Sequence, residues 1–190
     1  MKKQLIYIIL LTNSLLFAQS ESNLEKINTL LNETCKEIKS NLISPFTINF
    51  QAPGNLYFLK NRTEINFIEL EKDNNTAKDT LSFTIEEAGI TYKNIIKDGF
   101  FGNYLVERTA YMKGTYLLKQ NGKIITANQF NKTITDSINY EDINKLENIS
   151  LPFTRGTLPS EPIAPTIIEP LIAISSAVLT VVLFFTVRSK

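Results

Sequence analysis

The carboxylates are the main candidates for chemistry in this chain. The sequence of 190 residues contains no His, and Cys35 is its single cysteine. Zinc sites draw mainly on Cys and His, and nucleophile triads need a His or Lys base, so the lack of His removes most common catalytic and metal-binding arrangements. No catalytic, cofactor-binding or metal-ligating residue is assigned from the sequence.

A hydrolase that works with carboxylates needs two of them facing each other, about 5 to 10 Å apart in glycosidases. The candidates are Glu86, Glu87, Asp136, Glu141 and Asp142. Their spacing pairs no two of them, and most stand where a turn or the start of a helix favours an acid. We therefore expect a protein that is not an enzyme and that holds no cofactor.

Arg108 and Cys35 are the two other side chains that need an interpretation. Arg108 lies between Val106 and Ala110 in a predicted strand, on the same face by the period of two. It is either buried with a carboxylate partner or directed along a binding face, and a structural ion pair is favoured. Cys35 has no second Cys and no His beside it in the sequence, so we interpret it as a small buried hydrophobe.

The elements that position these residues begin with an amphipathic helix over 22–42. Ser22 and Glu25 form a capping box, in which each side chain accepts a hydrogen bond from the other residue's backbone N–H. Apolar residues then recur at steps of three and four, which predicts one buried face. That face consists of Leu24, Ile27, Leu31, Cys35, Ile38 and Leu42.

Further along the chain the apolar period changes from helical to two residues. Residues 46–50 and 81–87 alternate apolar and polar side chains, which predicts two half-buried strands. Residues 86–89 read as a turn that leads into another strand over 90–96. We therefore expect a hairpin at this point.

The second half of the domain gives three more signals. Residues 104–112 predict a strand, and Asn121-Gly122 between two apolar runs predicts a type I′ hairpin, because both central residues need positive φ. Residues 139–149 predict a short helix with acids in its first turn. Residues 21–150 are thus predicted to form an α+β domain, with the N-terminal helix packed on an antiparallel sheet of about six to eight strands.

Both ends of the chain carry apolar segments. Residues 1–20 pass from two lysines through an apolar stretch to small residues, the order of a signal peptide cleaved before Glu21. Leu171 to Val187 is 17 residues without a charge, nearly enough for a hydrocarbon core of about 30 Å at about 1.5 Å per residue. Residues 167–187 are therefore predicted to be a transmembrane helix.

The segments that flank this helix set its orientation. Residues 151–166 form a Pro-rich linker, expected to be extended and to hold the domain off the membrane. Residues 188–190 contain Arg188 and Lys190 and are predicted to be the cytoplasmic tail, because positive residues favour that side. Within the helix, Ser175, Ser176 and Ala177 form a small-residue patch that could seat a partner helix.

The C-terminal region also permits a different interpretation, as a cleaved sorting signal. Leu151 to Gly156 reads LPFTRG and resembles the LPxTG motif cut by sortases, but Arg155 stands where that motif has Gly. Glu169-Pro170 resembles the Pro-Glu-Pro signal of exosortase substrates, with the triplet incomplete. Under this alternative the chain is a surface protein that loses its C-terminal helix.

These features favour a non-catalytic, single-pass membrane protein of a bacterial envelope. Lys plus Arg number 20 and Asp plus Glu 19, so no basic excess points to nucleic acid. The domain is expected outside the cytoplasm, in the periplasm or at the cell surface, with the anchor in the inner membrane. It would act by contact with an envelope protein partner. The alternative is an apolar-ligand or lipid-binding module, with a cavity lined by some of the twelve Phe residues.

Overall fold

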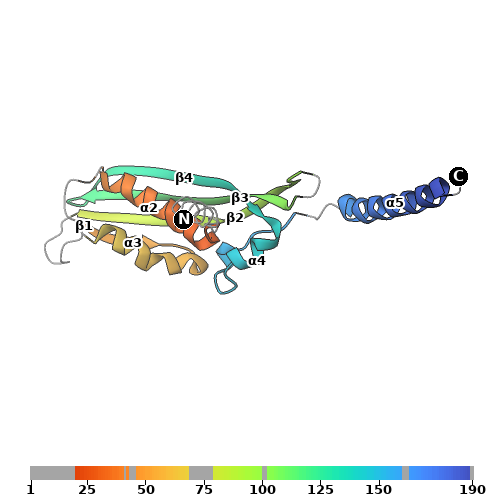
Figure 1. Ribbon diagram of the computed structural model, residues 1–190. Coiled ribbons are helices and arrows are strands. Elements are labelled where there is room, and N and C mark those ends of the chain that lie inside the picture. Colours follow the sequence, from red (N-terminus) through yellow and green to blue (C-terminus); the bar gives the residue numbers. More distant parts are fainter. Residues whose placement is uncertain are drawn as a thin grey trace, which may run out of the picture.

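The computed structural model describes residues 20–40, 42, 46–68, 79–99, 102–159 and 163–188, with side chains of the last range described for 170–186. These residues form a mixed α+β fold in which helices cover one face of a four-stranded sheet (Figure 1). The predicted signal peptide lies outside the described residues except for Ser20.

The sheet has the order β1-β2-β3-β4. The elements in chain order are α2 (Asn23–Ser40), β1 (Phe46–Gln51), η1 (Gly54–Leu59), α3 (Lys60–Phe67), β2 (Asp79–Lys97), β3 (Tyr104–Gln120), β4 (Lys123–Asn139), η2 (Tyr140–Asp142), α4 (Ile143–Leu146), η3 (Pro152–Thr154) and α5 (Ile163–Arg188). β1 pairs parallel with β2, and the other neighbours pair antiparallel. The expectation of a purely antiparallel sheet is therefore wrong at β1, since η1 and α3 lie in the long connection that parallel pairing requires.

The expected count of six to eight strands is also wrong, because segments read as separate strands are continuous. The turn expected at 86–89 is a β-bulge in β2, where the pairing with β3 shifts between Ile85 and Glu87. Odd-numbered residues face the core before the bulge, and even-numbered residues such as Ala88 face it afterwards. One extra residue resets the alternation without reversing the chain. The strand expected at 104–112 likewise continues as β3 as far as the next hairpin.

The hairpin predicted at Asn121-Gly122 is confirmed. Asn121 and Gly122 have φ angles of 50° and 78° and join β3 to β4. The helix expected at 139–149 is present in a shorter form, as η2 followed by α4.

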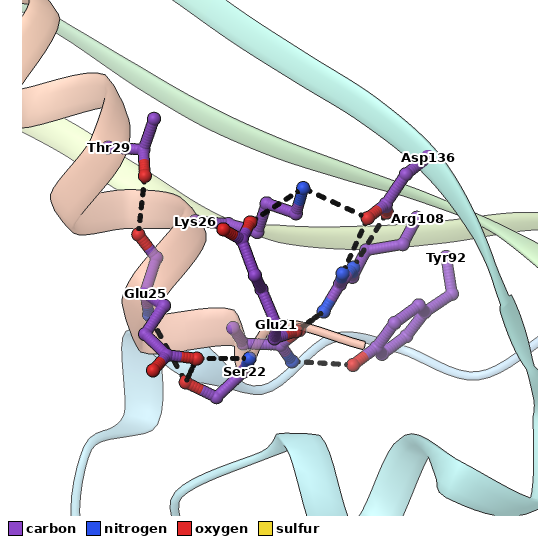
Figure 2. Close-up of polar contacts among 9 residues, drawn as sticks. Glu21, Ser22, Glu25, Lys26, Thr29, Tyr92, Arg108 and Asp136 are labelled. Atoms are coloured by element: carbon purple, nitrogen blue, oxygen red, sulfur yellow. Dashed lines mark hydrogen bonds and ion pairs between the residues drawn. The ribbon is translucent and has the colours of Figure 1, made fainter. Parts of the chain in front are cut away.

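α2 begins at the predicted capping box. The Ser22 N–H donates to Glu25 Oε2 at 2.7 Å, and the Glu25 N–H donates to Ser22 Oγ at 3.3 Å (Figure 2). The central members of the predicted apolar face, Ile27, Leu31, Cys35 and Ile38, are buried. α2 contacts β3, β4 and α3, while α3 contacts β1. Two helices thus share the covered face of the sheet.

Aromatic rings fill the space between the sheet and these helices. Phe83 stacks on Phe130 with ring centroids 5.3 Å apart, and its ring centroid is 6.3 Å from that of Phe50. Phe67 of α3 meets Phe46 edge to face at 5.8 Å. These rings therefore pack against one another in the core of the described domain.

α5 extends beyond the α+β domain in Figure 1. Its side chains from Pro170 to Thr186 are exposed all round the helix. Among the residues that the structure describes, no helix is both long enough and apolar enough to cross a membrane.

Candidate functional site

Arg108 is the centre of a polar cluster beneath the first turn of α2 (Figure 2). Its side chain is 0% exposed. Nε and Nη2 donate to the two carboxylate oxygens of Asp136 at 2.8 and 2.6 Å. Nη1 donates to the backbone oxygen of Glu21 at 2.7 Å and to Oδ1 of Asn23 at 2.9 Å. The guanidinium thus forms a bidentate ion pair with Asp136 of β4 and also holds the start of α2 in place.

The sheet register explains why these groups meet. Arg108 on β3 is directly opposite Asp136 on β4, and opposite charges favour this cross-strand position. Lys26, one turn into α2, lies 3.2 Å from Asp136 Oδ2 and 2.9 Å from Glu21 Oε2. Two cations and two carboxylates therefore balance one another within the cluster.

Asn23 connects this cluster to the rest of the domain. Its Nδ2 donates to the Tyr92 hydroxyl at 2.6 Å and to the backbone oxygen of Thr154 at 2.7 Å. Asn23 and Thr154 are both 0% exposed. One amide therefore joins α2, β2 and η3, and the segment expected to be an extended linker begins with a short helix packed on the domain.

The cluster is satisfied internally. In the described part of the chain, no buried side-chain nitrogen or oxygen lacks a hydrogen-bond partner. Unpaired buried polar groups would be the sign of a site awaiting a ligand. The arrangement is therefore that of a structural brace which holds the N-terminal helix to the sheet.

The pKa values of Asp136, Tyr92 and Cys35 are shifted by their surroundings. Burial alone would raise the pKa of Asp136, but hydrogen bonds and charge from Arg108 and Lys26 outweigh burial and hold this pKa below its ordinary value. Burial raises the pKa of Tyr92 to about 12. Burial also raises the pKa of Cys35 to about 12, so this thiol is a poor nucleophile near neutral pH.

The remaining carboxylate candidates lie on other parts of the domain. Glu87 forms an ion pair with Lys113 and accepts a hydrogen bond from the Tyr111 hydroxyl at 3.1 Å. Asp142 lies 2.8 Å from Lys145 in the α4 region. Glu86 and Glu141 are exposed. Among the described residues, no group of three or more His, Cys, Asp or Glu side chains could hold a metal ion.

A groove of about 570 Å³ lies between α2 and the segment formed by η1 and α3. It is lined by Leu24, Asn28, Tyr57, Phe58, Lys60, Asn61, Arg62 and Ile65. Tyr57, Phe58 and Ile65 are each at least 50% exposed. Sequence reasoning missed this groove because it assigned no helix over 60–67. The nearest signal is the apolar run Leu56 to Leu59, which combines buried leucines with these two exposed aromatic rings.

The small-residue patch of α5 lies on an exposed part of that helix. Ser175 Oγ donates to the Leu171 carbonyl oxygen at 2.7 Å, and Ser176 Oγ donates to that of Ala173 at 2.9 Å. Ala177 follows on the same helix. The serine hydroxyls thus bond to their own helix, and a role for the patch in seating a partner helix stays a prediction.

Comparisons with known proteins do not place the chain in a family. No protein-family model matches it, and no curated protein matches it. A crystal structure of a minor lipoprotein from Acinetobacter baumannii matches with 13% identity and a TM-score of 0.36, covering 53% of this chain and 69% of that chain. The rare lipoprotein B from Shewanella oneidensis matches with 12% identity and a TM-score of 0.32, covering 70% of this chain and 86% of that chain. Likenesses of this size support no argument about fold or function.

Proposed function

We propose that the chain is a single-pass membrane protein of the bacterial envelope, anchored by α5, whose α+β domain lies outside the cytoplasm and acts by protein contact. The observation that supports this best is the surface of α5. Its large apolar side chains from Leu171 to Phe185 are 45% to 68% exposed. A continuous apolar surface of this kind requires a covering, and lipid can cover all sides of a lone helix.

The hydroxyl groups of α5 support the same proposal. Thr180 donates to the Ser176 carbonyl oxygen at 2.8 Å and Thr186 donates to that of Val182 at 2.7 Å, just as the two serines bond to carbonyl oxygens earlier in the helix. In hydrocarbon every polar group must find a partner within the protein. These four hydroxyls already have one.

Helix length sets the extent of the proposed anchor. The uncharged 17-residue stretch is shorter than the span of about 20 residues that a bilayer core requires. Because no helix within the described residues is long and apolar enough to cross a membrane, the proposal requires the anchor to include Ile167 and Ile168 as well, with Glu169 near one interface and Arg188 at the other.

The non-catalytic part of the proposal rests on how the charged groups are used. Arg108 and Asp136 are held in the brace, and Glu87 and Asp142 each have a neighbouring lysine. Asp136 shares Lys26 with a second carboxylate, that of Glu21, but the pKa of Asp136 is held below its ordinary value, whereas the general acid of a glycosidase needs a raised pKa.

Alkaline carbonate extraction of bacterial membranes tests the anchor. The full chain should stay in the pellet, whereas Leu179→Arg combined with Val182→Arg should release it, because each charge at a helix centre costs about 2.5 to 3.5 kcal/mol on insertion scales. The matched control adds the same two charges at exposed apolar positions of the domain, Ile65→Arg and Ile68→Arg, and should remain in the pellet. Extraction of the unaltered chain contradicts the anchor.

Labelling with a membrane-impermeant maleimide tests the orientation. Ser137→Cys on the exposed sheet surface should react in intact cells with a permeable outer layer, and Lys190→Cys should react only after lysis. Cys35 is buried and serves as the internal blank. The opposite labelling pattern overturns the orientation.

The contact partner can be identified by crosslinking in the native host followed by mass spectrometry.

The groove between α2 and α3 favours a second candidate, an apolar-ligand or lipid-binding module. Its lining combines exposed apolar side chains with Lys60 and Arg62, a pattern that suits an anionic amphiphile. Solvent extraction and mass spectrometry of the purified chain should find an enriched amphiphile. Tyr57→Ser with Phe58→Ser should lose that ligand, and an unaltered chain that retains none contradicts this candidate.

A further inference from the structure

The outer edge of β4 is the longer of the two edges of the sheet. β4 is a terminal strand of 17 residues, Lys123–Asn139. In the described part of the chain, β3 is its only strand neighbour. An unpaired edge presents a row of N–H and C=O groups that can pair with another strand.

β4 lacks the usual protections of such an edge. Its residues include no Pro and no Gly. The one shift in its pairing with β3 lies near the hairpin, between Leu118 and Lys119 of β3. Its two charged side chains after Lys123 already have partners: Lys132 Nζ lies 2.6 Å from Glu37, and Asp136 binds Arg108. Edges that avoid association carry free lysines, prolines or central bulges.

The sequence of this edge is complementary to itself. Residues 129–139 read QFNKTITDSIN, and Ile134 stands between two threonines. Moving outward from Ile134, Lys132 matches Asp136 and Phe130 matches Ile138. If the segment lies antiparallel against a copy of itself, Lys132 lies opposite Asp136 of the copy, and the apolar side chain of Phe130 lies opposite that of Ile138.

We propose that two copies of this chain associate through their β4 edges, with Ile134 on the two-fold axis, to form one continuous eight-stranded sheet. Antiparallel pairing about a two-fold axis keeps residues of equal parity on the same face. Lys132 of each copy then lies opposite Asp136 of the second copy on the helix-covered face, and Thr133 lies opposite Thr135 on the other face.

Neighbouring registers fit less well. Moving the axis by one residue to Thr133 or Thr135 places Lys132 opposite an isoleucine of the second copy. Moving it by two residues to Lys132 or Asp136 places like charges opposite each other, which is unfavourable in a sheet. Of these five registers, only the one centred on Ile134 sets apolar side chains opposite apolar ones and also sets Lys132 opposite Asp136, each of which keeps its partner within its own chain.

A second copy of the chain would thus be one contact partner of the domain. Pairing through β4 does not depend on the membrane anchor. Dimers formed through α5 would bring no particular residues of β4 together. The register of β4 therefore distinguishes this interface from association through the anchor.

Cysteine crosslinking of the full chain in membranes tests the register. Co-expressed Asn131→Cys and Ser137→Cys chains, carrying different tags, should form a mixed disulfide dimer, because directly opposite residues have Cα atoms about 4.5 to 5.5 Å apart, within disulfide range. Either chain alone should not crosslink. Ala127→Cys co-expressed with Ser137→Cys is the matched control, since both positions are exposed, and it should not crosslink either, because these residues are four positions out of register. Equal yields from all pairs, or no dimer from the first pair, overturn the proposal.

A charge pair tests the interface without cysteines. Thr133→Lys with Thr135→Lys sets like charges opposite across the axis, so the dimer should be lost. Thr133→Lys with Thr135→Glu sets opposite charges there, so the dimer should persist. Both positions are exposed in the single copy, and circular dichroism checks that both variants fold. Light scattering of the full chain in detergent measures the mass, and equal masses for the two variants overturn the proposal.

Discussion

Two ion pairs link adjacent strands of the same sheet, on opposite faces. Arg108 and Asp136 join β3 to β4 on the helix-covered face, with side chains 0% and 30% exposed. Glu87 and Lys113 join β2 to β3 on the uncovered face, and both side chains are 48% exposed. The same chemical pairing thus occurs in two different environments.

The difference between the two ion pairs shows that the covering helix changes how much a charged pair contributes to stability. Beneath α2 the Arg108 side chain is shielded from water, and its Nη1 also holds Glu21 and Asn23 at the start of the helix. On the open face, solvent and salt screen the pair, and such pairs contribute little to stability. The covered pair is therefore a structural brace, while the uncovered face keeps polar groups available for contact.

The largest effect is expected from removal of the covered carboxylate. Asp136→Ala leaves Arg108 buried without its counterion, which typically destabilises a protein by about 3 to 5 kcal/mol, and the partial exposure of Asp136 favours about 3. Urea unfolding of the full chain in detergent, followed by circular dichroism, measures this loss. Arg108→Met with Asp136→Leu is the control and should be more stable than Asp136→Ala, because it removes both charges. A loss well below about 1 kcal/mol would show that the brace is not structural.

Acid should weaken the covered pair next. The pKa of Asp136 in the folded chain lies below its ordinary value of 3.8, so its stabilising contribution is complete above that value and is lost as pH falls through the folded pKa. The urea midpoint should therefore fall as pH is lowered below about 4. In Asp136→Asn this part of the acid dependence should be absent, and an identical acid limb in both proteins contradicts the assignment.

The smallest effect is expected on the uncovered face. Glu87→Gln removes the ion pair with Lys113 but leaves no buried charge without a partner, so the urea midpoint should be unchanged within error. Lys113→Gln should behave in the same way. A destabilisation comparable to that of Asp136→Ala would contradict this difference between the two faces.

The elements with short-range signals could be predicted from the sequence. The capping box of Ser22 and Glu25 needs only residues three apart, and the Asn121-Gly122 turn needs only two adjacent residues with positive φ. The buried face of α2 follows from a period that the helix itself imposes. In each case the determining interaction lies within one turn or one strand.

Features that depend on distant segments could not be predicted in this way. The change of parity near Glu86 suits a turn or a bulge equally well, and only the pairing with β3 selects the bulge. The parallel direction of β1 and the presence of α3 depend on how the chain packs across the sheet. For the same reason the groove between α2 and α3 was missed.

Arg108 depends on both the local sequence and the tertiary structure. The sequence by itself determined that a charged residue stands on the apolar face of a strand, and so needs a partner. Only the tertiary structure decided that Asp136, 28 residues away, is that partner and that Asn23 and Lys26 complete the cluster. The physical reason is that strand register and helix docking, which bring these groups together, are set by packing of the whole domain.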